Sequence, residues 1–284
     1  MIYFVSVFTL LFAAFQVDSG EYSFQHPTLP KPSKDYVLMT IPKSGTHLVN
    51  KLLMMLSDKK SVHLVDTQEF GMDKVYFPPH SHARPETLLN LYPINQRPCF
   101  EAHFNYSDLV RAYLKEKDDY VKIIMVRDLR DVCVSTAFYM DEHLDNSIGP
   151  NPSFDEKLLY IIEGHGLLAN SVYNVEREAN EALAWMKEPS VIACRFENLC
   201  GKAGGGTRNA QENQIILIAN ALGVTLSTEE LNAIVDNLWG NSPTFRQGKQ
   251  GGWKKYFKHY HIKAFKKRLG ALLIQLGYEK DNKW

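Results

Sequence analysis

Short apolar runs alternate with segments of helical periodicity along most of the chain. Residues 36–41 form a continuous apolar run rich in residues that favour β-structure, which predicts a buried strand. Apolar residues then recur at helical spacing over residues 48–56, which predicts a helix. The same order returns at residues 121–126, where a second predicted strand precedes a helix from Val132. Residues 191–194 predict a third strand.

Further helices are predicted at residues 154–162, 170–187, 215–222 and from about residue 262. Ser227 and Glu230 have the spacing of a capping box, which predicts a helix start at that point. Strands that alternate with helices are typical of an α/β fold. We therefore expect a three-layer domain with a central parallel sheet, and the chain length suits one domain.

The N-terminal segment differs from the rest of the chain. Residues 2–17 carry no charge, and the run is shorter than the roughly 20 residues of a membrane span. Val17 and Ser19 lie at suitable cleavage positions, so residues 1–20 are predicted to be a signal peptide or a short membrane anchor. The alternative is a helix or strand packed on the domain. The proline-rich residues 21–34 read as a linker, which leaves residues 35–284 as the domain.

This organisation predicts a place in the secretory pathway, either secreted or attached to a membrane, with the cytoplasm as the alternative. The formal net charge is zero, which argues against a nucleic acid partner. None of the four cysteines forms a CxxC pair, so we expect no metal site. Cys194 and Cys200 are either a disulfide or free buried thiols.

The loop after the first predicted strand has the composition of an anion site. Lys43 supplies a charge, Ser44 and Thr46 supply hydroxyl donors, and Gly45 lets the backbone approach a ligand closely. The start of the following helix offers unpaired N–H groups and a partial positive charge. The order differs from that of a Walker A loop, because the lysine precedes the glycine. The alternative is a solvated turn.

The segment Ile41-Pro-Lys-Ser-Gly-Thr46 resembles the first cofactor loop of the sulfotransferases that use 3'-phosphoadenosine-5'-phosphosulfate (PAPS). The resemblance implies that residues 43–47 bind the 5'-phosphosulfate end and that Lys43 stabilises the leaving group. His47 and Leu48 depart from the Thr-Trp pair that often follows in the cytosolic enzymes. Adenine stacking would then come from elsewhere, with Trp239 and Phe245 as the candidates.

The second strand leads into a segment that resembles the family's 3'-phosphate site. Arg127 ends the strand and Ser135 follows at the family's spacing, on the first turns of a helix that begins near Asp131. A forked guanidinium and a hydroxyl can bind one phosphate together. The alternative is that Arg127 and Asp131 form a salt-bridged turn without a ligand.

Residues 245–254 resemble the family's C-terminal cofactor loop. Arg246 and Gly248 match that pattern, whereas Gln247 stands where the family has lysine and Gly252 where it has aspartate. Phe196 stands where the family has a tyrosine near adenine. The resemblance extends over residues 36–278 and implies that Arg246, Gln247, Gly248 and Phe196 contact the cofactor.

Glu101-Ala-His103 lies where the family carries a Lys-x-His segment. His103 is the predicted general base, because a histidine near its ordinary pKa can accept the acceptor's proton. Glu101 is the alternative, since carbohydrate sulfotransferases tend to use glutamate, and His47 is a third candidate. Asn105 opens a glycosylation sequon close to this segment, and we expect it to be unused if the domain is lumenal.

The predicted function is sulfuryl transfer from PAPS to an acceptor hydroxyl, on a small alcohol or phenol or on a carbohydrate. One alternative is a non-catalytic relative that binds PAPS or a nucleotide. The other is a P-loop kinase, for which the sequence lacks both a Walker lysine and an acidic magnesium-binding strand end. Membrane attachment through the N-terminal segment and a homodimer are both compatible with the sequence, and no pattern identifies the acceptor.

Overall fold

The computed structural model describes residues 34–57, 62–63, 100–102, 106, 111, 115, 120–143, 152–165, 174–240 and 247–284. Within these residues a parallel sheet has the strand order β2-β3-β1-β4-β5. Its strands are β1 (Asp35–Thr40), β2 (Val62–His63), β3 (Phe100–Ala102), β4 (Tyr120–Val126) and β5 (Val191–Arg195). The three predicted strands are confirmed, and β2 and β3 are strands that the apolar pattern did not indicate.

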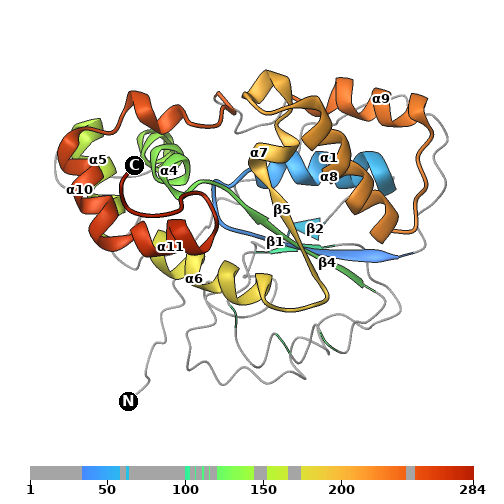
Figure 1. The fold of residues 1–284 in the computed structure, drawn as a ribbon, viewed down its shortest axis with the longest axis horizontal. Helices are drawn as coiled ribbons and strands as arrows, with labels where there is room; N and C mark the ends of the chain where they lie inside the picture. Colours follow the sequence, from blue (N-terminus) through green and yellow to red (C-terminus); the bar gives the residue numbers. More distant parts are fainter. Residues whose placement is uncertain are drawn as a thin grey trace, which may run out of the picture.

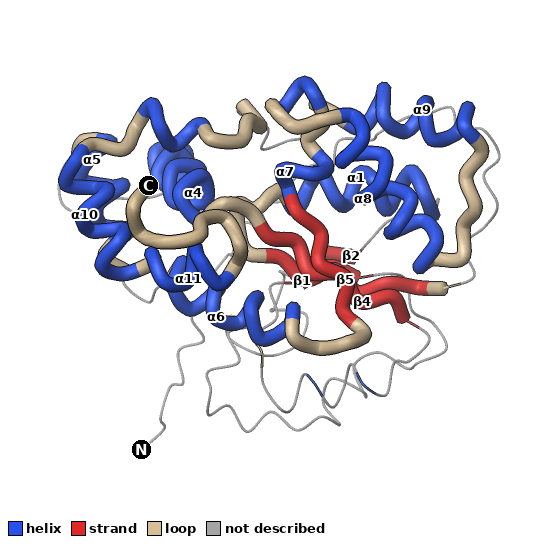
Figure 2. Tube along the Cα trace, viewed as in Figure 1, coloured by secondary structure: helices blue, strands red, loops and turns tan. Residues whose placement is uncertain are grey.

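The central strands are buried on both faces. Every residue of β4 is buried, which explains why its sequence is apolar at every position except Lys122 rather than alternating. In the register, Thr40 lies opposite Met125 and Met125 opposite Cys194. Since the strands are parallel, the loops that follow β1, β4 and β5 emerge at the same edge of the sheet (Figure 2).

One face of the sheet is covered by α1 (Thr46–Ser57), α7 (Phe196–Leu199), α8 (Arg208–Ala221) and α9 (Thr228–Leu238) (Figure 1). Side chains from alternate strand positions pack with these helices into one apolar cluster, which includes Leu38, Ile123, Leu52, Ile218 and Leu238. The 3₁₀ turn η2 (Lys202–Gly204) joins α7 to α8.

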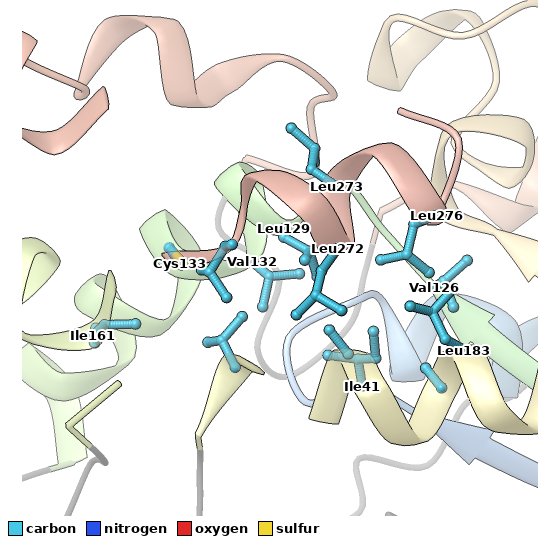
Figure 3. Close-up of a cluster of buried hydrophobic side chains, with 14 of the residues drawn as sticks. Ile41, Val126, Leu129, Val132, Cys133, Ile161, Leu183, Leu272, Leu273 and Leu276 are labelled. Atoms are coloured by element: carbon cyan, nitrogen blue, oxygen red, sulfur yellow. The ribbon is translucent and has the colours of Figure 1, made fainter. Parts of the chain in front are cut away.

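The opposite face carries α4 (Leu129–His143), α5 (Phe154–Ile162), α6 (Val175–Met186), α10 (His259–Arg268) and α11 (Gly270–Gln275). Their apolar side chains form a second cluster with the other side of the strands. Figure 3 shows Leu272 of α11, and Leu276 directly after this helix, near Ile41, Val126 and the α6 residue Leu183. The molecule is therefore a three-layer α/β structure, as the sequence predicted.

Helix α4 begins earlier than expected. Asp128 Oδ1 accepts a hydrogen bond from the Arg130 N–H at 2.9 Å, and the Asp128 carbonyl accepts one from Val132 N–H at 3.0 Å. These contacts make Asp128 the N-cap of a helix that starts at Leu129, not near Asp131 or Val132. Apolar periodicity misses the first turn because charged residues occupy it.

Other helix starts agree with capping rules. The predicted capping box of Ser227 and Glu230 is present, and Ser153 with Glu156 forms a second one at the start of α5. Cys133, Cys194 and Cys200 are free buried thiols, so the disulfide alternative for Cys194 and Cys200 is not realised.

The predicted signal peptide and most of the predicted linker lie outside the described residues, so the domain boundaries stay predictions. Among the helices that the structure does describe, each is too short or too polar to cross a bilayer.

Candidate functional site

Several of the residues singled out in the sequence lie where β1, β4 and β5 end. Open α/β sheets bind ligands at this edge, outside the carboxyl ends of the strands. Three segments meet there: the first loop (residues 41–45), the start of α4, and the C-terminal loop (residues 247–253). The β5–α7 junction adds Phe196 to the group.

The first loop has a backbone that requires glycine. Gly45 has φ 111°, and a Cβ there would lie 2.7 Å from Phe196 Cδ2 and 3.0 Å from Met125 Cε. Lys43 has φ 66°, a left-handed conformation that side chains other than glycine adopt at a cost. A strained residue in the turn before a helix start is typical of a functional loop.

The two hydroxyls of the loop already have partners inside the protein. Ser44 is fully buried, and its Oγ donates to the Met125 carbonyl at 3.2 Å. Thr46 Oγ1 donates to Thr40 Oγ1 at 3.0 Å. Ser44 therefore fixes the loop on β4, and its predicted role as a ligand donor, like that of Thr46, stays a prediction.

Lys43 is directed toward α4. Its Nζ lies 3.9 Å from the centroid of the Tyr139 ring, a cation–π contact. Tyr139 is one helical turn beyond Ser135, which lies half-buried on the second turn of α4. The sequence analysis missed Tyr139, although its spacing from Ser135 could have indicated a side chain on the same helix face.

Arg127 is the centre of the site. Its guanidinium is buried and lies 4.0 Å over the Phe196 ring, and its Nη2 donates to the Lys249 carbonyl at 2.9 Å. Nη1 lies 3.5 Å from the Lys43 carbonyl, so one side chain links the first and the C-terminal loops. Among the residues described, Arg127 Nε has no hydrogen-bond partner. A buried cationic donor without a partner suits a bound anion.

The alternative interpretation of this segment is realised in part. Asp131 Oδ2 lies 4.0 Å from Arg127 Nη2, an ion pair at the outer limit of distance. Asp131 also accepts two shorter hydrogen bonds, from Gly251 N–H at 2.7 Å and Trp253 N–H at 2.8 Å. Burial raises the pKa of this carboxyl, and the nearby Arg127 opposes the rise.

The C-terminal loop is also attached to the glycine loop (residues 201–206). Gln250 N–H donates to the Gly204 carbonyl at 2.9 Å, and the Gln250 side chain donates to the Gly205 carbonyl. A Cβ on Gly204 would lie 2.6 Å from Trp239, so the ring of Trp239 packs against this loop.

Glu197, next to Phe196, has a structural role. Its carboxylate accepts hydrogen bonds from Asp128 N–H at 3.0 Å and from the Tyr278 hydroxyl at 2.9 Å. Burial raises the pKa of Glu197, and these hydrogen bonds oppose the rise. The contacts hold the end of β4 to the C-terminal segment.

The structure brings together Lys43, Gly45, Arg127 and Phe196, four of the predicted site residues. Glu101 lies on β3, opposite Leu38 of β1. His47 is exposed on the first turn of α1, and Gln247 and Gly248 lie in the C-terminal loop. His103, Arg246 and Phe245 lie outside the described residues. Within the described residues, no group of three or more His, Cys, Asp or Glu side chains is placed to hold a metal ion.

Comparisons with known proteins address the family and the fold of the chain. The family model described as a sulfotransferase domain matches residues 33–194. The chain is similar in structure to mouse sulfotransferase SULT7A1 complexed with PAP, with a TM-score of 0.59 and 17% identity, over 88% of this chain and 91% of that one. No protein with a curated description matches the chain in sequence.

Two structures of retinol dehydratase are also similar. One is in complex with androsterone and the inactive cofactor PAP, with a TM-score of 0.59 and 16% identity. The other is in complex with retinol and PAP, with a TM-score of 0.58 and 17% identity. Each match covers 86% of this chain and 82% of the other. At these identities the likeness shows the fold.

Proposed function

The chain belongs to the sulfotransferase family, because a family model matches more than half of the chain. From this premise we propose that the protein transfers a sulfuryl group from PAPS to an acceptor hydroxyl. The observation that carries the proposal is the buried Arg127 guanidinium, with its unpartnered Nε, beside a strand–loop–helix anion site. The PAP that is bound in the similar structures supports PAPS as the co-substrate.

The reaction places two demands on the site. The acceptor oxygen forms a bond to sulfur as the bond from sulfur to the phosphate oxygen breaks, so negative charge develops on the departing phosphate. Lys43 and the start of α1 are positive groups at the same loop and would stabilise that charge. Lys43 is the residue that we assign to the leaving group.

Arg127 and Ser135 are assigned to the cofactor's 3'-phosphate. Arg127 offers the unpartnered Nε, and Ser135 lies on the helix that begins directly after it. Gln247 and Gly248, in the C-terminal loop that Arg127 contacts, are the described residues of the predicted third segment. Phe196 is assigned to the adenine end, with Trp239 as the further aromatic side chain near the glycine loop.

The acceptor loses a proton during the transfer, so a base is required near its hydroxyl. We assign this step to His103, with Glu101 on β3 as the alternative. Androsterone and retinol, which the similar retinol dehydratase structures contain, are apolar molecules with one hydroxyl. A small alcohol is therefore the first acceptor class to test, before phenols and carbohydrates.

The first test is calorimetric titration of the full chain with PAP. Wild type is expected to bind, and Arg127→Ala is expected to weaken binding roughly 10-fold to 100-fold, because a charge-assisted hydrogen bond contributes about 1.5–3 kcal/mol. Lys43→Ala is expected to reduce turnover more than PAP binding, since its partner is the departing group. Lys267→Ala, an exposed lysine on α10, is the matched control and should bind as wild type does.

The outcomes of this titration distinguish an active sulfotransferase from a non-catalytic relative. A folded wild type that does not bind PAP contradicts the proposal. Binding without turnover on any hydroxyl acceptor would instead support a non-catalytic relative, in line with the departures at Leu48 and Gln247.

A further inference from the structure

The C-terminal loop is held almost entirely through its backbone. The Lys249 carbonyl accepts from Arg127, and the Gly251 and Trp253 N–H groups donate to Asp131. The Gln250 N–H donates to the glycine loop. Backbone groups therefore make most of these hydrogen bonds, and the Gln250 side chain adds one to the Gly205 carbonyl. That explains how it keeps its place although residues 247 and 252 depart from the family pattern.

The partners of this backbone lie together on one short segment. Arg127 and Asp131 are four residues apart at the start of α4, so both reach the C-terminal loop from the same side. Arg127 contributes donors to the Lys249 carbonyl, and Asp131 contributes acceptors to the N–H groups of Gly251 and Trp253. Those two N–H groups lie at the start of the 3₁₀ turn η3 (Gly252–Lys255), where a carboxylate is a favourable partner.

The segment itself is fixed from behind by Arg130. Its guanidinium makes a two-pronged ion pair with Asp128 at 2.7–3.1 Å and a hydrogen bond to Glu279 at 2.7 Å. The rings of Trp253 and Trp284 lie 4.2 and 4.5 Å from it. Arg130 therefore holds the first turn of α4, which carries Asp131, to Asp128, Glu279 and the ring of Trp253.

We propose that Asp131 is a positioning residue for the cofactor: its carboxylate holds the C-terminal loop closed against Arg127 through the Gly251 and Trp253 N–H groups. The proposal rests on the proposed function, because the loop is taken to cover the 3'-phosphate of PAPS. Asp131 contacts the backbone of the loop, so it acts on the cofactor through residues 247–253.

Simple electrostatics makes the opposite prediction. A carboxylate 4.0 Å from Arg127 repels a phosphate bound to that arginine, so its neutralisation alone should tighten PAP binding. If Asp131 positions the loop, its neutralisation should weaken binding instead. Asparagine keeps one acceptor oxygen but presents an NH₂ group to the second N–H, which loses one hydrogen bond and opposes two donors.

The experiment compares Asp131→Asn with wild type in the full chain, by PAP titration and by hydrogen exchange of individual amides. The positioning role predicts a Kd for PAP raised roughly 10-fold or more and faster exchange at Gly251 and Trp253. Tighter or unchanged PAP binding would overturn it. Glu178→Gln is the matched control, because Glu178 is a buried carboxylate on α6 that contacts neither loop.

Two further measurements cover the cases in which wild type does not bind PAP or the variant does not fold. If wild type does not bind PAP, the proposed function fails, while amide exchange in the free protein still tests whether Asp131 holds the loop. If Asp131→Asn does not fold, amide exchange in the wild-type protein tests the proposal. Exchange at Gly251 and Trp253 as fast as in an unstructured peptide would overturn the proposal, and protection of both amides would support it.

Discussion

The first loop and the C-terminal loop meet at the same site but are built in different ways. The turn of the first loop is closed by neighbours in sequence: Ser44 N–H donates to the Ile41 carbonyl, and Leu48 N–H donates to the Gly45 carbonyl. The Ser44 hydroxyl then attaches this turn to Met125 of β4. The C-terminal loop takes its partners from positions more than forty residues away, among them Asp131 and Gly204.

The difference shows that the proposed cofactor site combines a loop shaped by local hydrogen bonds with a loop that depends on distant residues. A strand–loop–helix unit contains its own hydrogen bonds, so its shape follows from a few adjacent residues. The C-terminal loop has a defined position only when α4 and the glycine loop are in place. Changes near Asp131 should therefore disturb one loop and spare the other.

Arg130→Leu should have the largest effect on stability. It removes the partner of the buried Asp128 and of Glu279, and a buried ion pair that loses one partner costs about 3–5 kcal/mol. Denaturant unfolding would measure this loss. Amide exchange should show Trp253 and Gly251 losing more protection than Leu48 and Val49; an equal loss in both loops would contradict the comparison.

Gly45→Ala and Gly251→Ala form a matched pair between the loops. Alanine at position 45 should lower the free energy of unfolding in two ways. The left-handed backbone costs about 1–2 kcal/mol, and the clash with Phe196 costs about 1–3 kcal/mol. At position 251, where φ is also positive at 69°, a Cβ would meet nothing within 4 Å, so only the backbone cost applies. Denaturant unfolding should rank Gly45→Ala as clearly more destabilising, and equal losses would show that the first loop is not the tighter one.

Glu181→Gln, on α6 and outside both loops, should have the smallest effect and one that depends on pH. Burial, with the nearby Glu178, raises the pKa of Glu181 to about 8 from 4.5. The folded chain then holds a proton that the unfolded chain releases. This contribution is complete below about pH 4.5 and is lost as pH rises through 8.

The variant is therefore expected to melt a few degrees above wild type at pH 8.5 and at nearly the same temperature at pH 5. Thermal unfolding at both pH values measures this difference. PAP affinity should not change, since Glu181 contacts neither loop. Parallel pH profiles for the two proteins would contradict the assignment.

Local patterns predicted much of this molecule. Apolar runs identified β1, β4 and β5, and β1 and β4 lack alternation with polar residues because they are buried on both faces. The same patterns missed β3, which has three residues and is a strand only because it pairs with β1 and β2. They also missed the first turn of α4, whose charged side chains are buried by tertiary contacts.

The sequence by itself determined the α/β class, the first loop and the place of Arg127 at a strand end, since each follows from residues that are adjacent in the chain. Only the tertiary structure decided that Asp131 binds the C-terminal loop, that Arg130 lies between Trp253 and Trp284, and that Tyr139 meets Lys43. These contacts join segments that are far apart in sequence. Local periodicity carries no information about them, because their geometry exists only after the strands have paired and the helices have packed.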